Sequence, residues 1–394
     1  MIDNCMQSIL VKRCEAIRIH VDTSQLVSDT FNSNLTLHFI NNVIRPVVKY
    51  LEKTIKVRRR SSGVRKDDIC EPASECKRFE LGSFCEGVKP RHDFPDTAAD
   101  LVIVFTCKEE SSSGTLGSSL ACAFDVCDRP IYGRINISPV TVIASDTLNL
   151  KQMRAVVLHE MTHILVFDIA YFPLFRFSDG TPRVKREADG LPSKINYDVK
   201  YSAHGYMILN FANAKPQPHS IVSTTGVLDH FNERGVSCDC PGKSAQSWQR
   251  CLFNTTHGPC LGKIVTERVI EKTRAYFNCS TLNGAELENQ EPEPFYLFSS
   301  HWSSRSFKGD VMTSLVGESD KAVAALSNVT LALYEDSGWY KVDYSKSVKP
   351  KEGVDEGYLA GCGFFTDEIK SLFSQTAEDA TLFRVLLRII RRLF

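Results

Sequence analysis

The stretch Met153–Phe167, MRAVVLHEMTHILVF, contains the pentapeptide HEMTH at residues 159 to 163. Positions i and i+4 of an α-helix project from the same face, so His159 and His163 can bind one metal ion while Glu160 lies beside it as a general base. The spacing therefore predicts half of a site for metal-assisted hydrolysis.

The residues around the motif predict a buried helix. Buried polar groups without partners cost free energy, so two histidines and a glutamate there must satisfy one another through a metal or as a structural polar cluster. We favour the metal, because HExxH is the spacing of zinc peptidases. The apolar residues that predict burial are Val156, Val157, Leu158, Met161, Ile164 and Leu165.

A catalytic zinc usually has three protein ligands and a water, so a third ligand is needed. The short pattern HExxHxxGxxH does not supply it, because Val166 replaces the glycine and Ile169 the histidine. One other histidine, His301, lies in the sequence SSHW, eleven residues before Met312 in DVMT. The histidines outside the motif are His20, His38, His92, His204, His219, His230, His257 and His301.

These motifs resemble the leishmanolysin family, the metzincin-clan zinc metallopeptidases that include the major surface protease of trypanosomatids. In that family a long insertion separates HExxH from a third histidine in an SHW-like motif, and a Met-turn follows. The resemblance covers about residues 15–365, and the chain is similar to a truncated member. Other segments that resemble the family are FRFSDGTPR (175–183), FNCSTLNGAELENQ (277–290) and ALYEDSGWYKVDY (332–344).

The resemblance implies an α+β fold of metzincin-like zincin type, with a mixed twisted sheet, a zinc-binding active-site helix and two lobes flanking a substrate cleft. It implies one Zn²⁺ per chain, bound by His159, His163 and His301, with Glu160 as the general base and Met312 as an apolar floor. The implied activity is that of a zinc-dependent endopeptidase that hydrolyses peptide bonds in proteins with a Glu-activated, zinc-bound water.

Two alternatives stay open. The chain could be a catalytically impaired paralogue that acts in cell adhesion or protein binding, which the change at Val166 favours. With valine at this position, either the turn after the helix shifts by a residue, or the helix runs on and the site is strained. The chain could instead be a hydrolase of another clan with Glu187, 24 residues beyond His163, as third ligand. The proline-containing stretch 291–295 also predicts a stiff approach to His301.

We expect four segments along the chain. Residues 1–14 form an N-terminal extension that lacks a signal peptide. Residues 15–168 form a catalytic lobe with the HExxH helix, and residues 169–347 form a second lobe with the third histidine and the Met-turn. Residues 348–394 form a C-terminal tail, the remnant of a cysteine-rich domain, which ends in a basic, apolar segment too short to span a bilayer.

Within these segments the resemblance to the family implies a first strand around residues 16–19. Buried strands are predicted at residues 101–105 and 131–137, because apolar and β-branched residues dominate there. The HExxH helix is predicted over residues 149–167, with Asn149 as its N-cap.

The charges balance, with 47 Lys and Arg against 47 Asp and Glu in 394 residues. No overall field attracts nucleic acid, so we expect protein or peptide substrates and no nucleic-acid partner. The basic stretch 53–66 is predicted to be an exposed loop. Membrane association follows only from the family resemblance, because the chain shows no transmembrane segment or lipid-anchor signal.

The 14 cysteines include no CxxC pair, which favours disulfides in an oxidising compartment over a second, structural zinc site. The cysteine content and the family resemblance suggest a secreted or cell-surface protein. The lack of a signal peptide in this sequence argues against that localisation. Cys5 or Cys14 is a candidate for a propeptide cysteine that caps the zinc. Five glycosylation sequons occur, of which Asn136 is expected to be too buried to modify; they begin at Asn34, Asn136, Asn254, Asn278 and Asn328.

Overall fold

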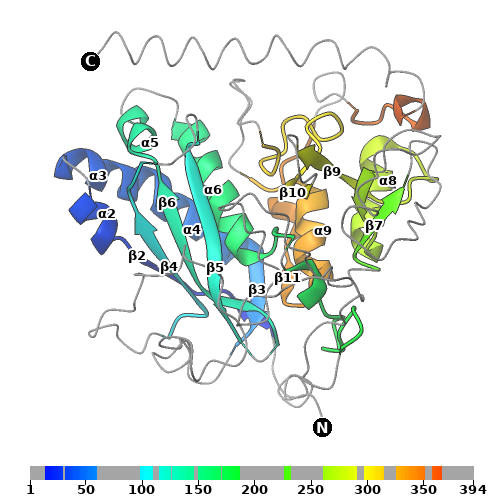
Figure 1. Cartoon of the computed structure of the whole chain (residues 1–394), viewed down its shortest axis with the longest axis horizontal. Coiled ribbons are helices and arrows are strands. Elements are labelled where there is room, and N and C mark those ends of the chain that lie inside the picture. Colours follow the sequence, from blue (N-terminus) through cyan, green and yellow to red (C-terminus); the bar gives the residue numbers. More distant parts are fainter. Residues whose placement is uncertain are drawn as a thin grey trace, which may run out of the picture.

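The structure is a computed structural model of the whole chain (Figure 1). It describes residues 14–29, 32–59, 98–109, 115–125, 127–145, 150–169, 171–186, 226–231, 261–290, 297–314, 325–350 and 357–365. Several predicted features lie outside these residues: Cys5, Asn149, Glu187, the stretch 291–295 and the C-terminal basic segment.

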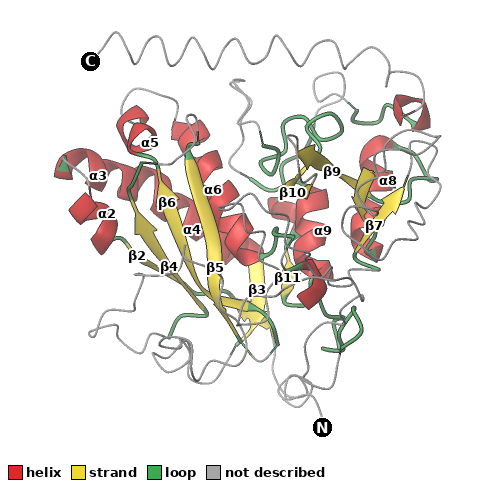
Figure 2. Ribbon diagram, in the orientation of Figure 1, coloured by secondary structure: helices red, strands yellow, loops and turns green. Residues whose placement is uncertain are grey.

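A four-stranded mixed sheet forms the N-terminal part of the fold, with strand order β2-β4-β6-β5 (Figure 2). Strands β2, β4 and β6 are parallel, whereas β5 lies at the edge and pairs antiparallel with β6. Helices and mixed sheets together confirm the predicted α+β class. The strands are β2 (Ile19–Asp22), β4 (Leu101–Thr106), β5 (Gly117–Phe124) and β6 (Pro130–Ile137).

The alternation of side chains along β4 explains how this sheet is covered. Leu101, Ile103 and Phe105 belong to the main core, whereas Val102 and Val104 belong to a smaller cluster. Successive residues of a strand point to opposite faces, so the two clusters lie on the two sides of the sheet. The main core contains residues of α4 and α6 as well as of the sheet. The helices of this part are α2 (Ser24–Asp29), α3 (Ser33–Phe39), α4 (Arg45–Thr54), α5 (Pro139–Ala144) and α6 (Leu150–Leu165), with a π-helical segment, Ile40–Ile44, joining α3 to α4.

A second four-stranded sheet is antiparallel throughout, with strand order β10-β9-β8-β7. Helices α8 and α9 pack against each other beside it (Figure 1). Its elements are β7 (Leu228–Phe231), β8 (Leu261–Ile264), α8 (Glu267–Phe277), β9 (Ala285–Gln290), β10 (Leu297–Trp302) and α9 (Asn328–Asp336).

A small third sheet joins the two parts of the chain. In it β3 (Ile55–Arg58) lies between β1 (Cys14–Ala16) and β11 (Tyr340–Val342), antiparallel to both. Short 3-10 helices occur at Phe172–Leu174, Tyr344–Lys346 and Cys362–Phe365.

Two predictions about local structure are wrong in detail. The basic stretch is not a loop over residues 53–58, because it ends α4 and forms β3, in which Ile55 and Val57 are fully buried. The predicted first strand is split into β1 and β2. The break comes at Arg18, whose backbone and side chain both donate hydrogen bonds to Asp100.

The other predicted elements are confirmed, since β4, β6 and α6 lie where the apolar patterns placed them, although α6 ends at Leu165 rather than at 167. Asn136 is buried, as expected. Its amide nitrogen donates to the Lys108 carbonyl oxygen, and its amide oxygen accepts from the Lys108 backbone and the Thr106 hydroxyl.

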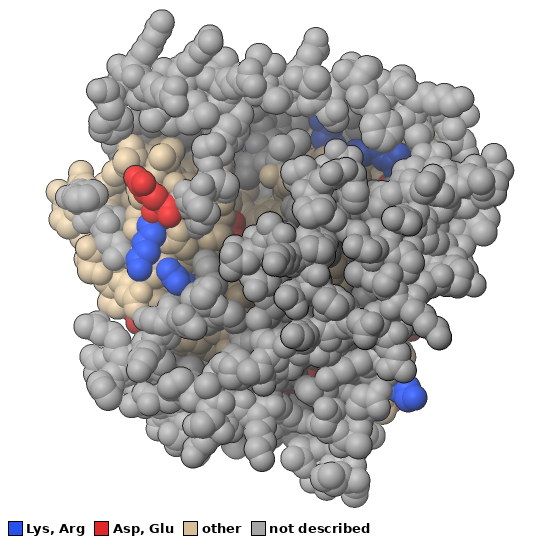
Figure 3. All heavy atoms as spheres, viewed as in Figure 1, with Lys and Arg blue, Asp and Glu red and all other residues tan. Residues whose placement is uncertain are grey.

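Disulfides are present, as the cysteine content predicted. Cys279, just after α8, is bonded to Cys362, and Cys122 and Cys127 of the N-terminal part are also in disulfides. Among the described residues, no helix is long and apolar enough to cross a membrane. On the face shown in Figure 3, the charged side chains of the described residues form small groups that include both signs.

Helix α6 packs unusually close to the sheet at Gly133 of β6. A Cβ atom at this position would lie 2.7 Å from Cγ2 and 2.8 Å from Cδ1 of Ile164. Only a residue without a side chain allows this approach, which sets the depth at which α6 lies on the sheet.

Gly133→Ala should therefore destabilise the fold by about 1–3 kcal/mol through overpacking. The double variant Gly133→Ala/Ile164→Ala should be more stable than the sum of the two single changes predicts, because Ile164→Ala removes the clashing atoms. Urea unfolding of the four proteins measures both effects. Strict additivity would show that the contact does not limit the helix position.

A buried ionic cluster holds the second sheet to the segment after β10. The carboxylate of Glu286 on β9 accepts from Arg305 (2.6 Å) and from the hydroxyl of Ser306 (2.7 Å), and Lys263 on β8 lies 3.5 Å away. Burial alone would raise the pKa of Glu286, but these two cations and the hydroxyl outweigh burial and the pKa is lowered.

A lowered folded-state pKa means that Glu286 stabilises the fold above its unfolded pKa of about 4.3, and that this stabilisation is lost as the pH falls through the folded value. Glu286→Gln should destabilise the protein by about 3–5 kcal/mol near pH 7, since it removes the buried partner of two cations. Denaturant unfolding between pH 7 and pH 3 should show this difference shrinking below about pH 4.3. A difference independent of pH would contradict the assignment.

Candidate metal centre

Helix α6 and strand β10 bring three histidines together. His159 and His163 lie one turn apart on α6, and His301 comes from the end of β10. Their Nε2 atoms are 2.9 Å (159 to 163), 3.2 Å (163 to 301) and 3.1 Å (159 to 301) apart. Among the residues that the structure describes, this is the only group of three or more His, Cys, Asp or Glu that could hold a metal.

The spacing of the three nitrogens fits zinc. Zn–N bonds of about 2.0–2.1 Å at tetrahedral angles place ligand nitrogens about 3.3 Å apart, close to the separations found here. Three neutral nitrogen donors, with no fourth His, Cys, Asp or Glu joining them among the described residues, match the donor set of a catalytic rather than a structural zinc site.

Backbone carbonyl oxygens orient the two helix imidazoles. Nδ1 of His159 donates to the carbonyl oxygen of Val311, and Nδ1 of His163 donates to that of Phe167, both at 2.7 Å. Because a carbonyl only accepts, the proton of each ring must be on Nδ1, which leaves the Nε2 lone pair for a metal. The structure therefore fixes the tautomer as well as the ring position.

All three rings are neutral at neutral pH. Burial lowers the pKa of His159, and burial together with the neighbouring His159 lowers the pKa of His301 to about 3. The pKa of His163 is lowered well below its ordinary value by burial and by the other two rings. Neutral imidazoles are the form that binds metals.

The chain turns after α6 without the glycine that the short metzincin pattern has. Val166 is buried, and the backbone nitrogens of Val166 and Phe167 both donate to the carbonyl oxygen of Thr162 (2.9 and 3.0 Å). Among the described residues other than glycine, a positive φ occurs only at Asp128, Asn278 and Leu359. The turn thus needs no left-handed residue at 166, and it directs the Phe167 carbonyl at His163.

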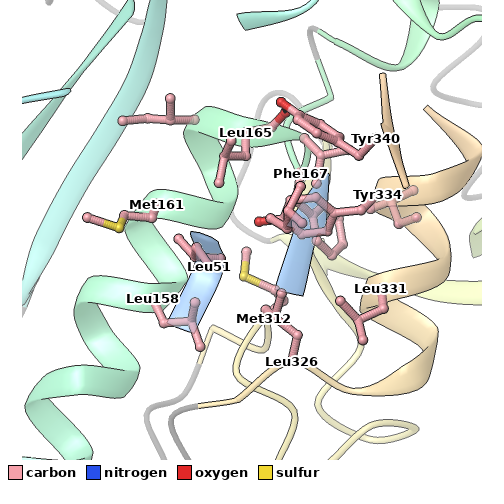
Figure 4. Close-up of a cluster of buried hydrophobic side chains, with 14 of the residues drawn as sticks. Leu51, Leu158, Met161, Leu165, Phe167, Met312, Leu326, Leu331, Tyr334 and Tyr340 are labelled. Carbon is pink, nitrogen blue, oxygen red and sulfur yellow. Dashed lines mark hydrogen bonds between the residues drawn. The ribbon is translucent and has the colours of Figure 1, made fainter. Parts of the chain in front are cut away.

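The segment with Met312 forms a tight turn beside His159, whose ring contacts the carbonyl oxygen of Val311. The Met312 backbone nitrogen donates to Oδ1 of Asp310 (2.8 Å), and its carbonyl oxygen accepts from the backbone of Trp302 (2.9 Å), the residue after His301. Figure 4 shows the Met312 side chain among buried apolar side chains that include Leu158, Leu326 and Leu331.

A buried hydrogen-bond network ties this turn to α9. The Thr330 hydroxyl donates to the Asp310 carboxylate (3.0 and 3.2 Å) and accepts from the indole nitrogen of Trp302 (2.9 Å). Burial raises the pKa of Asp310, while its hydrogen bonds with Ser327, Met312 and Thr330 oppose the rise. Sequence reasoning did not find Asp310 or Thr330, because neither lies at a recognisable ligand spacing.

Edge strand β5 contacts Glu160. The Ser119 hydroxyl lies 2.7 Å from Oε2 of Glu160 and 2.9 Å from its backbone oxygen, and the Glu160 side chain is buried. At Gly117, a Cβ atom would lie 3.2 Å from both Cγ and Oε1 of Glu160. Ser119 lies 41 residues before Glu160, so only the folded sheet reveals the contact.

None of the remaining predicted candidates that the structure describes joins the three histidines. Cys14 lies on β1 opposite Arg58, with a free thiol. His20 lies on β2, and His38 on α3 contacts the side chain of Asn42. Glu187, Cys5 and the histidines at 92, 204, 219 and 257 lie outside the described residues.

Comparison with known proteins agrees with this geometry. The profile of the leishmanolysin peptidase family, M8, matches residues 28–203 and 256–378. A leishmanolysin-like peptidase of Caenorhabditis elegans is 28% identical over 299 residues, which are 75% of this chain and 37% of that protein. One from Drosophila melanogaster is 31% identical over 241 residues, 60% of this chain and 28% of that protein.

More distant relatives have the same type of name. The ciliated left-right organizer metallopeptidase of Danio rerio is 25% identical over 166 residues, 40% of this chain and 25% of that protein. The aligned parts thus span well under half of the length of these relatives. Because the family profile covers more than half of the chain and includes all three histidines, the chain belongs to the leishmanolysin family of metzincin-type zinc metallopeptidases.

Proposed function

We propose that the chain is a zinc-dependent endopeptidase in which His159, His163 and His301 bind one Zn²⁺ and Glu160 is the general base. The observation that carries the proposal is the convergence of three Nε2 atoms within 2.9–3.2 Å, from two elements that are distant in the sequence. The family membership supports the same reaction class.

The proposed reaction combines the chemistry of a bound zinc with that of protein side chains. When bound, zinc would polarise the scissile carbonyl and lower the pKa of a water towards about 7. A Glu160 carboxylate oxygen would take the proton of that water and pass it to the leaving amine. Ser119 holds the carboxylate by its hydrogen bond to Oε2, and Met312 forms an apolar floor.

Strand β5 is the proposed binding edge for the substrate backbone. It is the last strand of its sheet in the described part of the chain, and Gly117 and Ser119 on it contact Glu160. An extended peptide can add to such an edge as a further strand, which would bring its carbonyl groups to the metal. The cleft would then lie between lobes 15–168 and 169–347, a division that stays a prediction.

The substrates would be proteins or peptides, as the names of the relatives indicate for them. The adhesion alternative has no specific support, because the ligand set and Glu160 are intact in the sequence. The turn at Val166, which had favoured that alternative, forms without strain.

Casein hydrolysis by the purified chain should be abolished by a zinc chelator and restored by added zinc. Glu160→Ala should lower the rate about 10²–10⁴-fold, because the general base is lost, without loss of bound zinc. The hydrolysis rate of Ser119→Ala should lie between those of the wild type and Glu160→Ala, because this change removes only a hydrogen bond to the Glu160 carboxylate. Cleavage that survives in Glu160→Ala at full zinc content would contradict the assignment of the base.

Zinc retention separates the two candidate third ligands. His301→Ala should lose zinc during dialysis against a weak chelator, because two imidazoles are an incomplete site, whereas Glu187→Ala should retain one zinc per chain. Elemental analysis of both variants beside the wild type is the measurement. Loss of zinc in Glu187→Ala alone would replace His301 by Glu187 as the ligand.

A further inference from the structure

We propose that Glu288 is the positioning residue for the third metal ligand, a carboxylate that accepts the Nδ1 proton of His301 and so orients the ring for metal binding. This inference rests on the proposed function, because it assumes that Nε2 of His301 binds the metal. Glu288 lies on β9, next to β10, which carries His301.

The first observation is an acceptor without a donor. Oε2 of Glu288 is buried and has no hydrogen-bond partner, and it lies 3.8 Å from Nδ1 of His301. A buried acceptor that stays unsatisfied costs about 1–3 kcal/mol. A closer approach of Oε2 to Nδ1 would remove that cost, and the imidazole is the nearby group that can supply a proton.

The second observation is the pattern set by the other two ligands. Nδ1 of His159 and Nδ1 of His163 each donate to a carbonyl oxygen at 2.7 Å. A metal-binding histidine almost always donates its second ring proton to an acceptor of this kind. For His301 the acceptor in the corresponding place is the Glu288 carboxylate.

The third observation is that Glu288 is itself held in place. Its other oxygen, Oε1, accepts from the hydroxyl of Ser314 (2.7 Å), two residues after Met312. Its neighbour Leu287 pairs with Trp302, the residue after His301. One side chain therefore connects β9, the third ligand and the segment of Met312.

The burial of Oε2 also argues against a role in substrate recognition. A substrate cation would need to reach this oxygen, but the protein already covers it. A carboxylate acceptor does what a carbonyl cannot, because its charge raises the basicity of the imidazole and compensates the charge of a bound cation.

The test compares Glu288→Gln and Glu288→Ala with the wild type. Glutamine keeps the shape and one acceptor oxygen but loses the charge, whereas alanine loses both. Glu271→Gln on α8 is the matched control, because it removes the same charge at a side chain that is 64% exposed. Competition with a chromophoric chelator gives the zinc dissociation constant of each protein without any measurement of activity.

We expect Glu288→Ala to bind zinc about 10–100-fold more weakly, Glu288→Gln to lie between it and the wild type, and Glu271→Gln to match the wild type. In ¹H–¹⁵N spectra of the zinc-loaded proteins, Glu288→Gln should shift the Nδ1–H signal of His301 and leave those of His159 and His163 in place. A merely structural residue would not move that one signal selectively. Should Glu288→Ala not fold, the glutamine variant and the spectra decide.

Different results would overturn the role of Glu288 and the proposed function. Unchanged zinc affinity and an unchanged His301 signal in Glu288→Gln, in a protein that loses zinc on His301→Ala, would overturn the role of Glu288 alone. Zinc binding that does not depend on His301 would overturn the proposed function and this inference with it. Ser314→Ala should weaken zinc binding less than Glu288→Ala, because the carboxylate remains.

Discussion

The position of α6 on the N-terminal sheet is the constraint on which the rest of the site depends. Gly133 lets the helix lie against β6 at Ile164, and Tyr334 of α9 contacts it from another side through a hydrogen bond to Thr162. Between these contacts the helix presents two imidazoles in fixed orientation. The third imidazole comes from His301, which lies 138 residues after His163 in the chain.

The placement of His301 depends on buried polar contacts as well as on apolar packing. Trp302 anchors the residue next to His301 through its backbone bond to Met312 and through its indole bond to Thr330. The Asp310 carboxylate accepts hydrogen bonds from the Met312 backbone nitrogen and from the Thr330 hydroxyl, so that the turn, β10 and α9 share one network. Such a network rigidifies a site when all its members are satisfied.

The sequence predicted the parts of the fold that depend on local pattern. HExxH on an apolar helix and the runs of β4 and β6 were recognisable because their periods match helix and strand geometry. The basic stretch was misjudged, since its charges obscured the alternation that buries Ile55 and Val57 in β3. Ser119, Asp310 and Glu288 could not be predicted as partners, because their contacts join residues far apart in the chain and follow only from the packing of sheets. Glu288 alone had a signal, its place within the segment FNCSTLNGAELENQ.

In the described part of the chain β5 is an edge strand, which has a consequence for the choice of substrate if the chain acts as proposed. An edge strand pairs only with a chain whose backbone N–H and C=O groups are free to form hydrogen bonds. A helix or an interior strand of a folded protein would therefore not bind there, whatever its side chains are. Susceptibility to cleavage would then follow the local unfolding free energy of the target segment more than its amino-acid sequence. A protein would then be cut at the segment that unfolds locally most often, so that the pattern of cleavage sites would follow its local stability.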